Sequence, residues 1–311
     1  MFAYSGLLPS RRIVLSTLLG AFTFGSNASG ATPASPQQAA MAARLPGVPK
    51  PPGTVNGKLP ERRGPEYPWG VALQDMEAMR PDVRVINLET AMTTHDKPWP
   101  DKGINYRCHP GNVATLKAGG VQVAGLANNH CLDWQIPGLM ETLETLEGAG
   151  IMVAGAGRNA SQACRPTVIQ LPPAADGQPS RSAAAAAAAD ADTAPAGPED
   201  VDGPRVLVWG LGHESSGVYD EWEAGEARPG VCMTDLSAAH AARVGAAAAA
   251  AKRPGSDIAV VSLHVGSNWG FTVPEAQRQF TRALIQGWIP RLYALTAWRA
   301  LACPLPPSPS L

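Results

Sequence analysis

The sequence predicts an α/β fold, in which strands and helices alternate along the chain. Three apolar runs rich in branched side chains, over residues 83–88, 121–127 and 258–265, have the composition of buried strands. Helical patterns over 137–148 and 235–252 lie between them. Alternation at this spacing favours crossover connections, which are typical of an α/β fold.

The size and charge of the chain limit its class. At 311 residues it can hold one α/β domain of ordinary size with extra segments, or two small domains. The 25 basic and 26 acidic residues give a formal net charge of −1, and the pattern of Lys and Arg residues indicates no clustered basic face. Nucleic acid is therefore not an expected partner. The 32 glycines and 30 prolines concentrate in three segments that are typical of linkers.

Residues 1–30 have the layout of an export or organelle-targeting peptide. Arg11 and Arg12 precede an apolar run over 13–24, and mainly small residues follow at 26–31. A non-functional N-terminus is the alternative interpretation. The apolar run is short and contains Ser, Thr and Gly, so we expect no stable membrane span.

A linker at 31–66 follows, rich in Pro, Gly and Ala and without periodicity, for which we expect disorder. A domain is expected over 67–287. Long polar loops beside strand ends are often functional, so a loop over 93–110 is expected near the site. The first half of the domain should contain a helix over 69–79, a strand over 83–88, that loop, helical turns over 112–118, a strand from 121, and a helix from Pro137 to Gly148.

A low-complexity insertion interrupts the second half of the domain. Residues 172–204 contain seven consecutive alanines and then acidic and Pro-rich sequence, with no apolar face to bury. We interpret them as a surface insertion. Residues 288–311 are expected to form an irregular tail. The remaining expected elements are strands over 151–154, 167–171, 205–212 and 258–265, and helices over 235–252 and 274–286.

Polar side chains come at the ends of the three strongest strands. Glu89 follows the first, Asn129 and His130 follow the second, and His264 lies near the end of the third. Strand ends of open α/β sheets gather at one crevice, so we expect these side chains to share a site. A carboxylate, an amide and imidazoles together suit Mn²⁺, Fe or Zn²⁺ better than Ca²⁺. We therefore predict a divalent metal site; separate solvated or packed polar side chains are the alternative.

Four more residues are candidates for contact with a substrate. Lys102 and Arg107 could bind an anionic group, and a solvated loop is the alternative for both. Asn128 adjoins the expected ligands. Asp133 suits either substrate contact or a helix entry, where it would support its neighbours.

The cysteines carry no pattern that marks a site. Their number is odd, and no two of them have the spacing of a paired motif or a zinc site. We expect them to be isolated thiols. They are Cys108, Cys131, Cys164, Cys232 and Cys303.

Short motifs mark the expected strand ends: Asn-Leu-Glu at 87–89, Ala-Asn-Asn-His at 127–130 with Asp133, Gly-Ala-Gly at 155–157 and Ser-Leu-His-Val-Gly at 262–266. Together with the loop at 102–107, they resemble the CapA-type proteins of capsule and poly-γ-glutamate synthesis. These proteins belong to the calcineurin-like metallophosphoesterase superfamily. The likeness covers about 67–287 and is interrupted by the insertion.

The resemblance implies a metallophosphoesterase-like α/β/β/α sandwich with one or two divalent metals at the strand ends. Carried over by position, Glu89, Asn129 and His264 would be metal ligands. His130 would lie beside a bound phosphate-like group as general acid or transition-state stabiliser. The expected partner is an anionic small molecule or polymer.

The chain departs from the family pattern in two places. The family opens with a strand that ends in Gly-Asp, and it closes with a strand that carries further histidines. Neither motif occurs here, and no histidine follows His264. The resemblance therefore predicts a sandwich that is incomplete at both ends, with the metal weakly bound or absent, because a stable site needs enough ligands.

Two hypotheses follow, and the sequence leaves open whether the chain is an enzyme. The first is a metal-dependent phosphoesterase-like hydrolase of capsule or poly-γ-glutamate biosynthesis, impaired by the missing ligands. The second is a non-catalytic fragment or accessory binding protein that retains the fold. Substrate and metal identity rest on analogy with the family alone.

Overall fold

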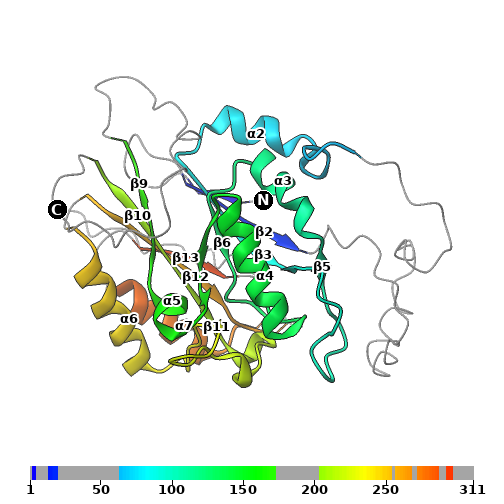
Figure 1. Cartoon of the computed structure of the whole chain (residues 1–311). Coiled ribbons are helices and arrows are strands. Elements are labelled where there is room, and N and C mark those ends of the chain that lie inside the picture. Colours follow the sequence, from blue (N-terminus) through cyan, green and yellow to red (C-terminus); the bar gives the residue numbers. More distant parts are fainter. Residues whose placement is uncertain are drawn as a thin grey trace.

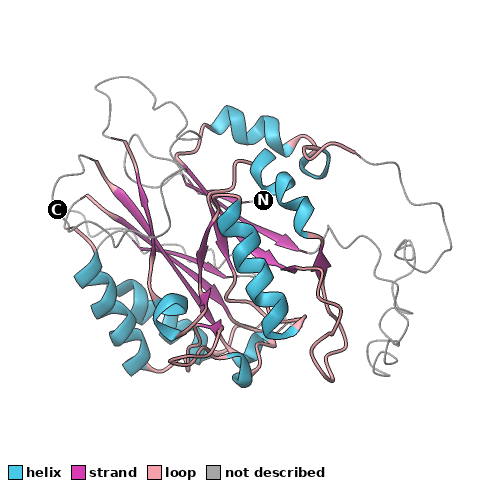
Figure 2. Cartoon of the chain, viewed as in Figure 1, coloured by secondary structure: helices cyan, strands magenta, loops and turns pink. Residues whose placement is uncertain are grey.

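The computed structural model describes residues 2–4, 13–19, 63–172, 203–253, 256–267, 272–286 and 292–296. Most of the expected targeting segment, linker, insertion and tail lies outside the described residues. The described part forms two open sheets with helices on their outer faces, as Figure 1 and Figure 2 show. The expected α/β/β/α fold class is confirmed.

The two sheets contain the predicted strands. The first has the order β1-β2-β3-β6-β7, with bounds Phe2–Tyr4, Ile13–Leu19, Val83–Glu89, Val123–Gly125 and Met152–Ala154. The second has the order β13-β12-β10-β9, with bounds Leu292–Thr296, Ile258–His264, Arg205–Gly212 and Thr167–Gln170. Two short pairs, β4 with β5 and β8 with β11, have bounds Ala91–Met92, Arg107–Cys108, Ala156–Gly157 and Gly230–Val231.

Helices cover the outer face of each sheet (Figure 1). The first sheet carries α3 (Val113–Ala118) and α4 (Gln135–Gly148), and the second carries α6 (Ala238–Ala251) and α7 (Glu275–Gln286). The remaining helices are α2 (Ala72–Met79), α5 (Ala160–Cys164) and the short 3-10 turns η2 (Tyr67–Trp69), η3 (Pro110–Asn112), η4 (Glu214–Ser216) and η5 (Asp220–Trp222).

Local chemistry sets where the helices begin. The backbone N–H of His240 donates to Ser237 Oγ at 3.0 Å, so α6 begins after this cap and not at 235 as predicted. Asn159 caps α5 as a predicted helix cap should, accepting from Gln162 N at 2.9 Å. The helix predicted over 69–79 is split at Gly70, whose φ of 52° is not helical.

Three apolar cores correspond to the three interfaces between the four layers. The core between the first sheet and its helices includes Ile86, Leu88, Leu139 and Leu143. The core between the second sheet and its helices includes Leu207, Trp209, Leu263 and Phe280. The core between the two sheets includes Val83, Val85, Val206, Val208, Ile258 and Val260. All of these side chains are buried, so each of the three interfaces excludes solvent where the structure describes it.

The side chains that face the space between the two sheets are polar at one end of that space. Successive side chains of a strand point to opposite faces, so residues two apart share a face. On β3 the row that faces the second sheet reads Val83, Val85, Asn87 and Glu89. On β12 the row that faces the first sheet reads Ile258, Val260, Ser262 and His264. The space is therefore apolar at the amino ends of the strands and polar at their carboxyl ends.

The sheets approach closely in the middle of this space. A Cβ added to Gly210 on β10 would lie 2.7 Å from the Cα of Gly155, which follows β7. Gly155 also has a φ of 87°, a conformation that side chains other than glycine rarely adopt. These two glycines allow the backbones to meet just before the polar end.

A cluster of charged side chains lies at the amino ends of β10 and β12. Asp257, directly before β12, accepts from Arg205 Nε at 2.9 Å and from Arg253 Nη2 at 3.1 Å. The backbone N–H groups of the same two arginines also donate to it, at 3.0 and 2.8 Å. Arg253 Nη2 donates further to Gly203 O at 2.6 Å, where the described chain resumes after the insertion. The contacts of Asp257 and its arginine partners therefore link the segment at 203–205, Arg253 and the start of β12.

The strand neighbours of β3 and β12 differ from expectation. β2 pairs in parallel with β3 from Ile13 to Leu19, and β13 pairs in parallel with β12. Parts of the expected targeting segment and irregular tail thus form strands, because their apolar, β-prone runs complete the hydrogen bonds of exposed strand edges. The sandwich is not short of strands at these two positions, although neither run contains an aspartate or a histidine.

The expectation of isolated thiols was wrong for one pair of cysteines. Cys164 and Cys232 form a disulfide across a sequence separation of 68 residues. The fold brings them together because α5 ends beside the β8–β11 pair. Cys108 and Cys131 are free and buried.

Candidate metal centre

Segments that are far apart in the sequence bring the predicted ligands together. Glu89 is the last residue of β3, His264 is the last residue of β12, and Asn129 lies in the turn after β6. The two strands belong to facing sheets, and their inward rows end in these side chains. Glu89 and His264 are 0% and 1% exposed, so bulk water does not solvate them.

The contacts of His264 define the geometry. His264 Nε2 lies 3.0 Å from Asn129 Oδ1, and His264 Nδ1 lies 4.0 Å from Glu89 Oε1. Since an amide oxygen only accepts, Nε2 carries the proton and Nδ1 has a free lone pair. Among the described residues, neither His264 Nδ1 nor Glu89 Oε2 has a hydrogen-bond partner. Buried polar atoms are rarely left so, and both are atoms of kinds that bind divalent cations.

Burial shifts both groups toward their neutral forms. Desolvation raises the pKa of Glu89 to about 7, although the hydrogen bond from Asn87 opposes this. Desolvation, with a smaller contribution from the charge of His130, lowers the pKa of His264 to about 3. A neutral imidazole is the form that binds metals, and a nearby cation would favour the charged carboxylate. A carboxylate, an amide and a neutral imidazole are donor types that suit a divalent metal. Asn129 Oδ1 lies at Nε2, however, on the other side of the His264 ring from the free Nδ1, so the three donors do not converge on one point in this arrangement.

His130 is oriented by a buried carboxylate. Its Nδ1 lies 2.8 Å from Asp133 Oδ2, and because an ionised carboxylate only accepts, Nδ1 carries the proton. This leaves Nε2 as the ring nitrogen that can meet a reacting group. The ring of Tyr106 lies against the imidazole, with a centroid distance of 4.2 Å. His130 thus has a fixed tautomer and a fixed plane.

Lys102 joins the same cluster through Asp133. Its Nζ lies 2.7 Å from Asp133 Oδ1 and 3.5 Å from His130 Nδ1. Asp133 also accepts from the backbone N–H of Tyr106 at 2.5 Å and is fully buried. Of the two roles considered for Asp133, this geometry matches the support of its neighbours. Lys102, like Asp133, is a predicted substrate residue that lies beside His130.

Two buried amides connect the ligands to the His130 turn. Asn128 accepts from the backbone N–H of His130 at 3.0 Å and donates to Asn87 Oδ1 at 3.0 Å. Asn87 donates to Glu89 Oε1 at 2.7 Å. Asn87 was not among the predicted site residues. Its position two residues before Glu89, and therefore on the same face of β3, was the signal available in the sequence.

Arg107 is placed differently from the other predicted residues. Its guanidinium lies 4.2 Å from the ring centroid of Trp134, and its Nη1 donates to His95 O at 2.9 Å. These contacts pack the loop over 93–110 against the start of α4. The geometry gives Arg107 a packing role.

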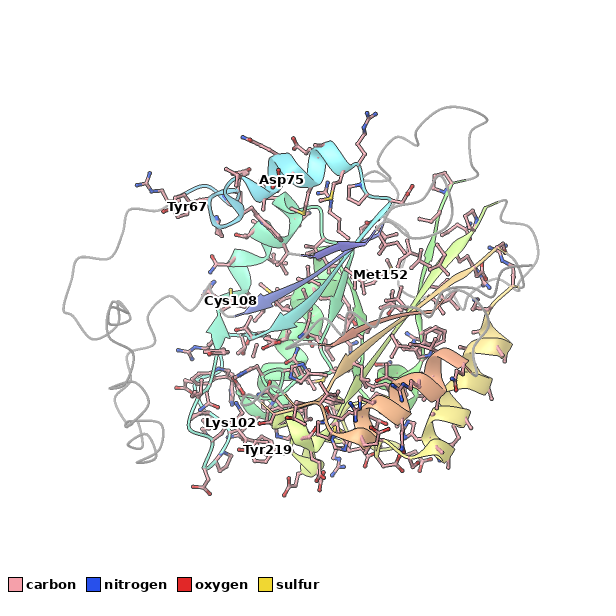
Figure 3. The ribbon with its side chains drawn as sticks, turned by 180° about the vertical axis from the view of Figure 1, so that it is seen from behind. Tyr67, Asp75, Lys102, Cys108, Met152 and Tyr219 are labelled. Carbon is pink, nitrogen blue, oxygen red and sulfur yellow. A yellow bond between two sulfur atoms is a disulfide. The ribbon has the colours of Figure 1, made fainter. Side chains whose placement is uncertain are left out.

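Aromatic side chains from two loops lie beside Lys102. The rings of Trp99 and Trp222 are 5.3 Å apart, and those of Tyr219 and Trp222 are also 5.3 Å apart. Lys102 Nζ lies 6.0 Å from the Trp222 ring. Figure 3 labels Lys102 and Tyr219 at the same end of the molecule, and both lie near the Trp222 ring although they come from different loops. The loop over 213–229 was not predicted to contribute to the site, since nothing in its composition distinguishes it from a solvated loop.

The described part of the chain sets limits on other sites. Among the described residues, no group of three or more His, Cys, Asp or Glu side chains is arranged to bind a metal; the third predicted ligand is an amide. None of its helices has the length and apolar content needed to cross a bilayer.

Comparisons with known proteins agree with the motifs. The family model described as bacterial capsule synthesis protein PGA_cap matches residues 35–289. Proteins from two strains of Mycobacterium tuberculosis, each named a probable polyglutamine synthesis accessory protein, are 37% identical to this chain over 237 residues, which is 76% of this chain and 54% of each relative. An uncharacterized protein of Sinorhizobium fredii is 42% identical over 55 residues, 18% of this chain and 12% of that protein.

This chain thus spans about half the length of the mycobacterial relatives, since it covers 54% of them. The family match is broader, because it extends over most of the chain and includes all four strand-end motifs. The chain belongs to the family of bacterial capsule synthesis proteins, PGA_cap.

Proposed function

We propose that this chain has a metal-dependent, phosphoesterase-like hydrolase site that serves capsule or poly-γ-glutamate synthesis. The observation that carries the proposal is the pair of buried atoms, Glu89 Oε2 and His264 Nδ1, that have no partner among the described residues. Leaving two such atoms unpaired costs stability, and a bound cation accounts for their retention. The mycobacterial relatives are named probable polyglutamine synthesis accessory proteins, which supports a role in the synthesis of an amino-acid polymer.

The residues divide into a binding part and a reacting part. Glu89 Oε2 and His264 Nδ1 are the free donors for Mn²⁺, Fe or Zn²⁺, and Asn129, the third predicted ligand, would join them only by leaving His264 Nε2. The metal, when bound, lowers the pKa of a water molecule and polarises a phosphoryl or acyl oxygen. His130 has its Nδ1–H fixed on Asp133, which stabilises the imidazolium, so that His130 Nε2 can give a proton to the leaving oxygen. The ligand set is small, and we expect weak metal binding.

Lys102 supports an anionic substrate group. Its ammonium lies at the His130 imidazole and is largely buried, with its side chain 8% exposed. Charge-assisted hydrogen bonds to a phosphate or carboxylate would form there at the edge of the metal site. The nearby aromatic rings of Trp99 and Tyr219 could contact the apolar part of a polymer chain.

The test is hydrolysis of p-nitrophenyl phosphate by the full chain loaded with Mn²⁺. His130→Ala should lower kcat/KM by about 10²- to 10⁴-fold, the usual contribution of a general acid, with the melting temperature retained. His109→Ala is the matched control, because His109 is an exposed loop histidine that only caps η3. Equal activity of the His130 and His109 variants, or no activity in the folded wild type, would reject the proposal.

A second candidate is a non-catalytic accessory binding protein. It is favoured by the two strands beside β3 and β12, since β2 and β13 contain no aspartate or histidine where the family pattern has ligands. Metal binding separates the two candidates. Saturable binding of about one Mn²⁺ per chain when the ion is added, measured by calorimetry, favours the hydrolase. No saturable binding by the folded chain favours the accessory protein.

A further inference from the structure

The loop over 213–229 lies against Lys102 and returns to the second sheet through a disulfide-bonded segment. It carries Trp222, whose ring centroid lies 6.0 Å from Lys102 Nζ. After the loop the chain forms β11, and Cys232, the next residue, is bonded to Cys164 at the end of α5. Gly212 N donates to Cys232 O at 2.9 Å, so this segment also lies beside β10.

α5 contacts this part of the chain at both of its ends. At its start the backbone N–H of Ala160 donates to Gly225 O, in the loop itself, at 2.7 Å. At its end the Cys164 side chain is covalently bonded to Cys232. A displacement of α5 would therefore release the loop in two places.

β11 transmits this restraint to Trp222. Ala224 N donates to Val231 O at 2.9 Å, and Glu223 forms a bridge with Val231. Gly230 passes so close to the loop that an added Cβ would overlap Trp222 O. The backbone at Trp222 thus packs directly on the strand that precedes Cys232.

The non-covalent contacts of this region belong to short elements. α5 has 5 residues, and β8 and β11 have 2 residues each. Helices and strand pairs of this length have little stability of their own. A covalent bond between residues 68 apart restricts the open states of such a region much more than their few hydrogen bonds do.

The disulfide is open to attack from one side. Cys164 is exposed, whereas Cys232 is 4% exposed. A thiolate of a dithiol reductant would attack the Cys164 sulfur, so that the bond to Cys232 breaks and Cys232 takes up a proton. The second thiol of the reductant would then displace Cys164, which also takes up a proton, and the reductant leaves as a disulfide.

We propose that the Cys164–Cys232 disulfide is a redox-sensitive link that keeps the loop over 213–229 closed on Lys102, and that its reduction opens this loop. The Lys102 side chain is 8% exposed in the closed arrangement, so opening would uncover its ammonium. The consequence for binding of an anionic substrate rests on the proposed function. The opening itself requires neither a metal nor activity.

The experiment measures how fast N-acetoxysuccinimide acetylates Lys102 in the full chain, with mass spectrometry of peptides as the readout. Three forms are compared: oxidised wild type, wild type reduced with dithiothreitol that is removed before labelling, and Cys164→Ser. Lys97 is the internal control, because it is exposed and lies on the same loop as Lys102. Cys303→Ser is the matched control variant, since it removes a cysteine and leaves the disulfide intact.

A second label separates local opening from unfolding of the whole chain. Cys108 and Cys131 are free and buried, so iodoacetamide reaches them only when the first sheet and its helices separate. Their alkylation is measured in the same three forms.

We expect acetylation of Lys102 to be at least about 10-fold faster in the reduced and Cys164→Ser forms, as loss of a crosslink of this span should strongly favour local opening. Lys97 should change by less than about twofold, and Cys108 and Cys131 should stay protected. Unchanged Lys102 labelling in the reduced chain, the same increase in Cys303→Ser, or an increase only together with alkylation of Cys108 and Cys131 would overturn the inference. Absence of phosphoesterase activity in the oxidised, folded chain would reject the proposed function and not the opening.

Discussion

Asp257 and Glu89 are both almost fully buried; Asp257 directly precedes β12, and Glu89 is the last residue of β3. Asp257 accepts from the side chains and backbones of Arg205 and Arg253, whereas Glu89 accepts from Asn87 and has one oxygen without a partner among the described residues. Burial raises the pKa of both carboxyl groups. At Asp257 the arginines outweigh this and lower the pKa to about 2, while the pKa of Glu89 rises to about 7.

The difference indicates that the Asp257 carboxylate stabilises the fold, whereas the Glu89 carboxylate lacks a matching cation among the described residues. A buried charge matched by protein cations needs nothing further, and breaking such a cluster is costly. A buried carboxylate without a cation lowers stability, and such local costs are expected at functional sites. The same sandwich therefore contains one carboxyl group whose removal should weaken the fold and one whose removal should strengthen it.

The largest effect on stability is expected from a substitution of Asp257, at the amino end of β12. Asp257→Ala should lower the free energy of unfolding by about 3 kcal/mol, because it leaves two partly buried arginines and two backbone N–H groups without their acceptor. Urea denaturation near neutral pH measures this. The Kd for Mn²⁺ should stay within about twofold of wild type, since Asp257 lies away from the site. A loss below about 1 kcal/mol would remove the contrast between the two carboxyl groups.

A substitution of Glu89, at the carboxyl end of β3, is expected to change the free energy of unfolding in the opposite direction. Glu89→Gln in EDTA should raise the free energy of unfolding by about 1 to 2 kcal/mol, because an amide keeps the bond from Asn87 and removes an unmatched buried charge. The variant should also lose stabilisation by added Mn²⁺ in thermal melts. Glu147→Gln, at an exposed pair with Arg158, is the control and should change stability by less than about 0.5 kcal/mol. Destabilisation by Glu89→Gln without metal would contradict the comparison.

The smallest expected effect is on the pH dependence of stability in acid. The pKa of Asp257 is lower in the folded chain than its ordinary value of 3.8, so the stability it contributes is present above that value and is lost as pH falls toward about 2. This amounts to about 1 kcal/mol after screening by solvent is considered, since the arginines are partly exposed. Measured unfolding between these pH values should depend less on pH in Asp257→Asn. An unchanged slope would show that other groups dominate acid unfolding.

Much of the fold was predictable from short-range patterns. The apolar runs that end in Glu89 and His264 identified β3 and β12, because buried parallel strands are apolar on both faces. Strand alternation then fixes which residues share a face, so the meeting of these two side chains follows once the sheets are paired. The family motifs added the residue types at each strand end.

Other features depend on contacts that leave no trace in local sequence. The disulfide between Cys164 and Cys232 joins residues 68 apart, and an odd number of cysteines without paired spacing gave no reason to match them. The approach of Trp222 to Lys102 likewise depends on how two long loops fold over the strand ends. Strand alternation places Asn87 and Glu89 on the same face of β3, so a hydrogen bond between them could have been predicted. Which group donates could not, because this depends on the contact between Asn128 and Asn87.

The crosslink between Cys164 and Cys232 has a consequence for where this protein can be made. Cys232 donates its backbone N–H to Gly155 O and accepts from Gly212 N, so the covalent bond fastens a segment that lies between the two sheets beside their closest approach. Disulfides persist in oxidising surroundings and are lost where glutathione and thioredoxin keep thiols reduced. Material produced in a reducing cytosol would therefore carry two extra thiols, and its stability would understate that of the oxidised chain.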